Sequence, residues 1–427
     1  MINQETVIIT TLLAILTFVI PQRHVLLSLI LAVCFIPFDQ RIIILNLDFT
    51  PARLLVVLTI LRIFVRSEQR KIRWNLFDGM IFMWAMCGTA VYLIQWADFK
   101  AFVYRSGILF DIIGIYWICR QNIRSWDEVA SISKILAMCA LVSAILVFVE
   151  RTTEHNPFVL LGKVTTGVQR GRYRCHGSFQ HPITLGLFWA NLVPIFIGYA
   201  ITNRSKISYW WAATAACVLI VIATGSSTPA ITLLCVLLFL PLFYLRRYGK
   251  QIVLSFIAVI LFLSIIMNKP IWHLVSRVRF IPGSTGWHRY LLINAAIEHF
   301  DEWALLGTRG TSHWGHGLRD ITNNYIRQGV DGGLITLLLF VIVLVMAIRI
   351  CSKYSLLSAH RTEQWLSWAF CTSVLGHCIS CLGVSYFGKI PALLYLTFAV
   401  VVMVADKSRQ YINSTSRQIV IGKVTFE

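Results

Sequence analysis

Residues 170–186 form a short polar stretch in which side chains that bind anions recur at close spacing. The stretch reads RGRYRCHGSFQHPITLG, with arginines at 170, 172 and 174 and histidines at 176 and 181. A guanidinium group offers a planar fork of N–H donors that matches the oxygens of phosphate or carboxylate groups. The residue types of this stretch therefore predict an anion-binding loop.

A second polar stretch, at 268–332, repeats these residue types and adds groups that can move protons. His313, His316 and Asp320 lie in and after a glycine-rich run, and glycine permits tight turns and close approach of the backbone to a ligand. Imidazole and carboxylate groups near arginines are typical of a general base beside an anion clamp. Within it, Leu291, Ala295 and Ile297 recur at helical spacing, which predicts that the stretch is partly helical, with a helix that lies on the membrane surface or caps a cavity. The arginines of the stretch are Arg277, Arg279, Arg289, Arg309, Arg319 and Arg327.

The rest of the chain is strongly apolar. Of the 427 residues, 57% are hydrophobic and 13% are charged, and the mean hydropathy is +0.72, which together exclude a soluble globular protein. In a soluble protein the net charge of +19 would suggest a nucleic-acid partner. With this composition we expect contact with a lipid bilayer and no nucleic acid.

The apolar residues are grouped in about thirteen runs long enough to cross, or nearly cross, about 30 Å of hydrocarbon. Runs this apolar do not alternate as barrel strands must, so we expect helices. The predicted fold is all-α, a polytopic integral membrane protein with about 12–14 transmembrane helices in a single membrane domain, 1–427. The runs lie at 7–20, 25–37, 51–65, 77–96, 103–119, 132–149, 183–202, 208–223, 229–245, 251–267, 333–350, 366–383 and 388–405.

Lysine and arginine in the short loops indicate the orientation of these helices. The basic short loops, together with a tail at 406–427, are expected in the cytoplasm, which puts the loops at 150–182 and 268–332 on the outer side. Long loops escape the charge rule, so topology does not explain the arginines in these two loops. A bound anion explains them, and snorkelling or contact with lipid headgroups is the alternative.

Several motifs in this half of the chain resemble those of one membrane-protein superfamily. The stretch RCHGSFQHP, at 174–182, is similar to the arginine, glycine, phenylalanine and proline loop of the O-antigen ligase and polysaccharide polymerase superfamily. TGSST, at 224–228, stands where that family has a serine-rich turn between two spans. The larger outer loop is also similar, through Arg289, Leu306-Gly307, Asn323-x-Tyr325 and Gly332-Gly333-Leu334.

The resemblance implies a metal-independent glycosyltransferase of GT-C-like architecture, with no cofactor. Such an enzyme would take a glycan from undecaprenyl diphosphate at the periplasmic face of the bacterial inner membrane. Arg172, Arg174 and Arg289 would hold the diphosphate, because no Asp-rich metal motif is present to neutralise it. The residues expected to support them are Arg277, Arg279, Arg309 and Arg319 for the diphosphate, and His176, His181 and Tyr325 for the rest of the substrate.

The proton acceptor is less clearly indicated. Many relatives carry a His-Asn pair that aligns here with Thr322-Asn323, so the histidine of the pair is absent. Asp320 is the first candidate to replace it, before His316 and His313. Asn323 stands at the position of the asparagine of that pair and is expected to take part in catalysis. Alternatively, Asp320 caps a helix that starts near Thr322 and His181 caps the helix that starts at Pro182.

Three functions are compatible with these features. The first is a polymerase that joins undecaprenyl-diphosphate-linked repeat units into exopolysaccharide or O-antigen, with a chain-length regulator and a flippase as partners implied by the resemblance. The second is an O-antigen ligase that transfers finished glycan to a lipid core or to protein. The third is a transporter or flippase of lipid-linked sugars, which predicts paired charges deep in discontinuous helices rather than arginines in outer loops.

Overall fold

The computed structural model describes residues 2–44, 47–164, 168–169, 172–277 and 286–424, and it describes side chains outside 43–48, 168–172 and 414–424. Most of this chain is helical, and its other regular elements are two short antiparallel hairpins. The α-helices are α1 (Gln4–Val19), α2 (Leu26–Phe35), α3 (Pro51–Val65), α4 (Leu76–Trp96), α5 (Phe99–Asn122), α6 (Trp126–Thr153), α7 (Pro182–Ala190), α8 (Val193–Thr202), α9 (Ile207–Ala223), α10 (Ser227–Phe239), α11 (Gly249–Ile266), α12 (Leu274–Arg277), α13 (Gly286–Glu298), α14 (Phe300–Trp303), α15 (Asn324–Leu357), α16 (Arg361–Gly383) and α17 (Ile390–Val424).

The remaining elements are short. The hairpins pair β1 (Ile42–Ile44) with β2 (Leu47–Phe49) and β3 (Val168–Gln169) with β4 (Arg172–Tyr173). The 3-10 helices are η1 (Gln22–His24), η2 (Pro157–Leu161), η3 (Arg204–Lys206), η4 (Leu240–Tyr248), η5 (Ile271–His273) and η6 (Ser312–Trp314).

The all-α membrane architecture expected from the sequence is confirmed, but with fewer crossing helices. Within the described chain, nine helical stretches are long and apolar enough to cross a membrane, against the predicted 12–14. Every predicted run overlaps a helical segment, yet α1 has 16 residues, α2 has 10 and α3 has 15, which is short for a span. In addition, α10 and α11 are joined through η4 into one stretch, 227–266.

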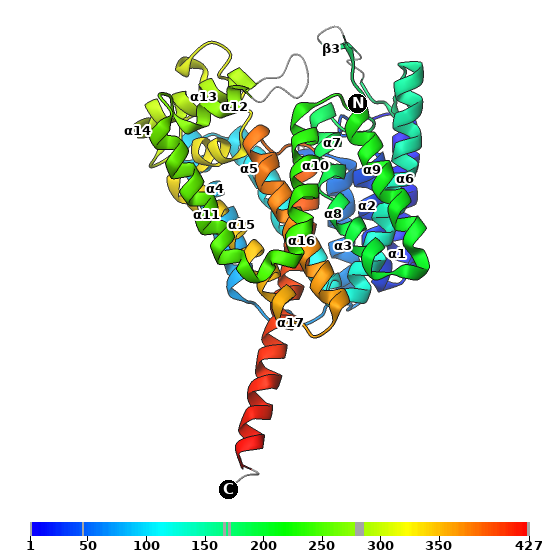
Figure 1. The fold of residues 1–427 in the computed structure, drawn as a ribbon. Coiled ribbons are helices and arrows are strands. Elements are labelled where there is room, and N and C mark those ends of the chain that lie inside the picture. The colour runs from blue at the N-terminus through cyan, green and yellow to red at the C-terminus, as the bar shows by residue number, and fades with distance from the viewer. Residues whose placement is uncertain (1, 45–46, 165–167, 170–171, 278–285, 425–427) are drawn as a thin grey trace.

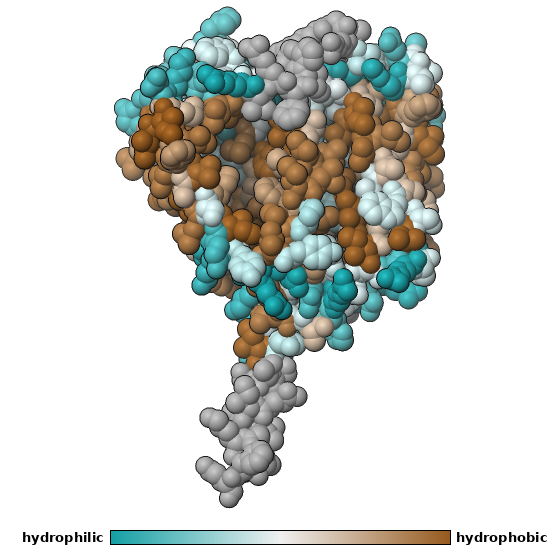
Figure 2. Space-filling view, viewed as in Figure 1, coloured by the Kyte–Doolittle hydropathy of each residue, from teal (hydrophilic) through white to brown (hydrophobic). Residues whose placement is uncertain are grey.

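The surface of the molecule matches this description. Figure 2 shows a broad apolar band between two hydrophilic ends, as expected for helices surrounded by hydrocarbon. In Figure 1, α12, α13 and α14 lie above the long helices, and α17 continues below them to the C-terminus. The segment 406–424, predicted as a tail, is therefore the helical end of α17.

The helices that position the polar loops pack at the centre of the bundle. The stretch 182–202, which forms α7 and α8, is 94% buried, and α7 contacts α9 and α10. On the other side, α16 contacts α8, α10 and α15. The upper ends of α9, α10 and α16 are thus close enough to meet the loops that precede α7 and α15.

Candidate functional site

Arg174 lies against the turn between α9 and α10. Its Nε donates a hydrogen bond to the carbonyl oxygen of Thr224 at 3.2 Å, and its Nη2 donates to the hydroxyl of Ser226. The neighbouring backbone N–H, that of Cys175, donates to the carbonyl oxygen of Ala223 at 3.4 Å. The first polar loop is therefore fixed to this turn through both backbone and side chain. We call residues 224–228 the 224–228 turn.

Arg289 reaches the same turn from the second polar loop. Its Nη2 donates to the hydroxyl of Thr228 at 2.7 Å, and its Nε donates to the carbonyl oxygen of Gly383, at the end of α16, at 3.2 Å. The residue is 7% exposed. The structure thus brings Arg174 and Arg289 to opposite ends of one short turn.

The orientation of α13 explains why Arg289 is buried. The inward face carries Arg289, Leu292 and Ala295, at intervals of three residues. The sequence indicated a helix here with Leu291, Ala295 and Ile297 at helical spacing, but Leu291 and Ile297 are exposed. The helix is confirmed, and its buried face is rotated so that the arginine points toward the bundle.

The first polar loop is shaped by a buried carboxylate, Glu150, at the end of α6. Its side chain is fully buried and accepts hydrogen bonds from the backbone N–H groups of His176 and Gly177, at 3.1 and 2.9 Å. It also accepts from the side-chain amide of Asn156 and lies 3.0 Å from Nδ1 of His176. His176, predicted to bind substrate, is therefore buried against Glu150 and helps to fix the conformation of this loop.

His181 caps α7, as one of the two interpretations of the sequence predicted. Its Nδ1 accepts a hydrogen bond from the backbone N–H of Ile183 at 3.2 Å. Burial, with the charges of Arg174 and His176, lowers the pKa of His181 to about 4. The imidazole beside Arg174 is therefore neutral near pH 7.

Asn323, rather than Asp320, caps α15. The side-chain oxygen of Asn323 accepts from the backbone N–H groups of Tyr325 and Ile326, and its Nδ2 donates to the carbonyl oxygen of Leu382 at 3.4 Å. The alternative interpretation, in which Asp320 caps this helix, is thus wrong. Because Leu382 precedes the Gly383 that accepts from Arg289, Asn323 lies at the edge of the arginine site. The hydroxyl of Tyr325 donates to the carbonyl oxygen of Cys378 at 3.0 Å.

The three predicted proton acceptors of the outer loop do not contact the 224–228 turn. Asp320 and His316 are exposed, and the backbone oxygen of Asp320 lies 3.1 Å from Nε2 of His288. His313 is also exposed and lies 2.6 Å from Glu302, in a separate cluster. The structure therefore brings the two arginines together without these residues.

The other predicted arginines are distributed over the outer loop. Arg277 and Arg319 are exposed, and Nε of Arg309 donates to the carbonyl oxygen of Gln95, at the end of α4, at 2.8 Å. Arg279 and the side chain of Arg172 lie outside the described residues.

Two residues that shape the arginine site and its loop, Gly383 and Glu150, were not predicted from the sequence. Gly383 closes α16 against the turn, and a Cβ atom there would lie 2.4 Å from Cγ2 of Thr228. A glycine at the end of an apolar run gives no signal of such a contact. Glu150 stood at the end of a predicted span, where a charge usually anchors the helix end.

The charge of Arg289 has no acidic partner in the described part of the chain. Its recorded acceptors are a hydroxyl and a carbonyl oxygen, both neutral, and burial alone lowers its pKa. A guanidinium keeps its proton in proteins, so the positive charge remains. A buried charge without a counter-charge is unfavourable by several kcal/mol, about the effective desolvation penalty of one ion. An anion is the ligand that would relieve this cost.

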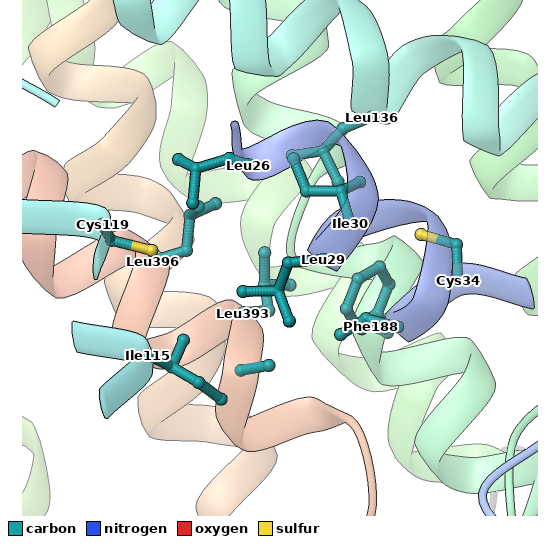
Figure 3. A pocket seen from close by; sticks show the side chains of 12 residues that line it. Leu26, Leu29, Ile30, Cys34, Ile115, Cys119, Leu136, Phe188, Leu393 and Leu396 are labelled. Carbon is teal, nitrogen blue, oxygen red and sulfur yellow. The ribbon is translucent and has the colours of Figure 1, made fainter. Parts of the chain in front are cut away.

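An apolar cavity lies in the bundle, between α2, α5, α6, α7 and α17. Figure 3 shows it lined by aliphatic, phenylalanine and cysteine side chains. It offers no charged group to a ligand, so the arginine site is the better candidate for an anionic substrate. Comparisons of the chain with protein-family models, with curated proteins and with solved structures found no match.

Proposed function

We propose that this chain is a metal-independent glycosyltransferase. In this proposal it polymerises undecaprenyl-diphosphate-linked oligosaccharide repeat units into exopolysaccharide or O-antigen, at the outer face of the bacterial inner membrane. The observation that carries the proposal is the buried Arg289, which has no carboxylate partner among the described residues and meets Arg174 at the 224–228 turn. Two guanidinium groups held this way suit a diphosphate.

The proposed reaction is the displacement of a diphosphate. The acceptor hydroxyl of one unit attacks the anomeric carbon of another, a new C–O bond forms, and the bond from that carbon to the diphosphate oxygen breaks. The leaving diphosphate keeps the electron pair, so negative charge develops next to the two arginines. Fixed positive groups at that position stabilise the transition state more than the ground state.

The hydroxyl proton must pass to a base as the bond forms. Asp320 remains the first candidate, since its side chain is exposed on the outer loop and accepts no hydrogen bond from the residues that the structure describes. His316, whose imidazole is also exposed on the outer loop, is the second. An Asp320→Asn variant separates the two candidates by its effect on product.

The polymerase is preferred to the ligase because of the residue at 228. In the ligases that the chain resembles, a basic residue falls near this position, whereas here Thr228 accepts a hydrogen bond from Arg289. The turn therefore orients an arginine from another loop instead of supplying a cation of its own.

The test is a gel of glycans from a strain that lacks the protein, with long-chain glycan resolved from its lipid-linked precursor. Accumulation of single repeat units on undecaprenyl diphosphate is the expected result for a polymerase. Full-length glycan still attached to undecaprenyl diphosphate would instead identify a ligase. Single repeat units that a membrane-impermeant label cannot reach in intact cells, because they stay in the cytoplasmic leaflet, would identify a flippase and overturn the proposal.

A Gly383→Ala variant should reduce long-chain product by roughly tenfold to a hundredfold. The added Cβ would displace Thr228 and weaken its hydrogen bond to Arg289, at a cost of about 1.5–3 kcal/mol for a bond to a charged group. Product is measured by gel in cells with equal amounts of protein in the membrane.

Two further variants control for helix effects. Gly79→Ala makes the same chemical change in α4, where no atom lies within 4 Å of the new Cβ, and should leave the product unchanged. Adding Thr228→Ser to Gly383→Ala removes the clashing methyl group, keeps the hydroxyl and should restore product. An active Gly383→Ala single variant would mean that the Arg289–Thr228 contact is dispensable.

A further inference from the structure

His299, Glu302 and His313 form a compact cluster in the outer loop. Nδ1 of His299 lies 2.7 Å from Oε1 of Glu302, and Nε2 of His313 lies 2.6 Å from Oε2 of the same carboxylate. One ligand atom from each of the three residues lies within 4.8 Å of the others. Two imidazoles and a carboxylate are a donor set that zinc commonly takes in proteins.

The cluster is built on ordered elements. His299 follows α13, Glu302 lies in α14, and His313 lies in η6. The indole of Trp314 stacks on His299, with ring centroids 5.4 Å apart and planes 2° from parallel, and its N–H donates to Oε2 of Glu302 at 3.0 Å. Trp314 itself is 7% exposed and packs in the small apolar core of the loop. The three ligand side chains are therefore held together by a buried anchor.

This cluster is separate from the arginine site. Arg289 lies near the start of α13 and His299 directly follows its end, so the two are roughly 15 Å apart at 1.5 Å per residue. A cation at the cluster would leave the diphosphate chemistry to the arginines. Metal-independent transfer and a metal in the outer loop are thus compatible.

We infer that His299, Glu302 and His313 bind one divalent transition-metal ion, with zinc as the ion of best fit. Each imidazole nitrogen and one carboxylate oxygen would supply a lone pair, and water would complete a tetrahedral shell because the cluster is solvent-exposed. The proton that each imidazole shares with Glu302 moves to its other ring nitrogen or to water. The metal would link α13 and α14 to η6, in place of the two hydrogen bonds between the imidazoles and Glu302.

Zinc binding to the full-length protein in detergent, purified without a polyhistidine tag, tests the inference. Titration against a chromogenic chelator should give one zinc per chain. His299→Ala and His313→Ala should each weaken binding roughly a hundredfold or more, beyond the 10- to 100-fold typical when a group that only supports a ligand is lost. Cobalt(II), used as a spectroscopic substitute, should show the absorption of a tetrahedral site in the wild type and not in these variants.

Two further variants distinguish lost ligands from a disrupted loop. Glu302→Gln keeps the size of the side chain and one acceptor oxygen but removes its charge, and should weaken zinc binding while the protein stays folded in detergent. His155→Ala removes an exposed histidine from the other polar loop and should bind as the wild type. Wild-type stoichiometry below one, or binding that persists in both histidine variants, would overturn the inference. Because the readout is metal binding, it is independent of the proposed transferase activity.

Discussion

Replacing Arg289 by alanine is expected to lower the amount of long-chain glycan roughly a hundredfold to a thousandfold. Removing one preorganised donor from a developing anion typically costs about 3–4 kcal/mol of transition-state stabilisation. Arg289 should have an effect of this size because it is buried and fixed by Thr228 and Gly383. The measurement is the chain-length distribution on a gel, in a deletion strain that carries the variant.

Two companion variants interpret this result. Arg289→Lys keeps the charge but loses the planar fork, so it should retain an intermediate amount of product. Arg247→Ala removes an exposed arginine from η4, outside the site, and should behave as the wild type. Long-chain product at the wild-type level in Arg289→Ala, with equal protein in the membrane, would exclude Arg289 from the reaction.

The second large effect is expected on stability, from Glu150→Ala. The variant leaves the N–H groups of His176, Gly177 and Asn156 without their acceptor in a buried place. Removing one partner of a buried charged network destabilises proteins by about 3–5 kcal/mol. The melting temperature in detergent, followed by fluorescence-detected size-exclusion chromatography, should therefore fall well below that of the wild type.

Two control variants show whether a change in melting temperature comes from the buried position of Glu150 or from the loss of its negative charge. Glu5→Ala removes an exposed carboxylate from α1 and should not change the melting temperature. Glu150→Gln keeps one acceptor oxygen but places an amide N–H₂ among donors, so it should give an intermediate loss. If Glu150→Ala melts with the wild type, the carboxylate does not hold the loop.

The elements of the fold could be predicted from the sequence because hydrocarbon imposes a simple rule. Each long apolar run is helical, since a continuous apolar run lacks the alternation of a barrel strand and only a helix then satisfies its backbone in a bilayer. The count of crossing helices was less accurate, because α1, α2 and α3 are apolar but short. Apolarity identifies a helix more reliably than it identifies a complete crossing.

The candidate site could be predicted only in part, because its geometry depends on contacts between distant segments of the chain. Arg174 and Arg289 stood out by residue type and by the motifs around them. Their common turn, and the role of Gly383 in closing it, depend on contacts between segments far apart in sequence. Asp320 was expected at the site because it precedes Asn323, but the backbone leaves Asp320 exposed while Asn323 turns into the bundle.

The neutral acceptors around Arg289 have a consequence for exchange at the site. Because a hydroxyl and a carbonyl oxygen orient this guanidinium without cancelling its charge, it would attract any anion of the medium that reaches it. In the proposed function such anions would compete with the diphosphate, so the affinity for substrate would fall as salt concentration rises. The ionic strength at the site would then influence turnover.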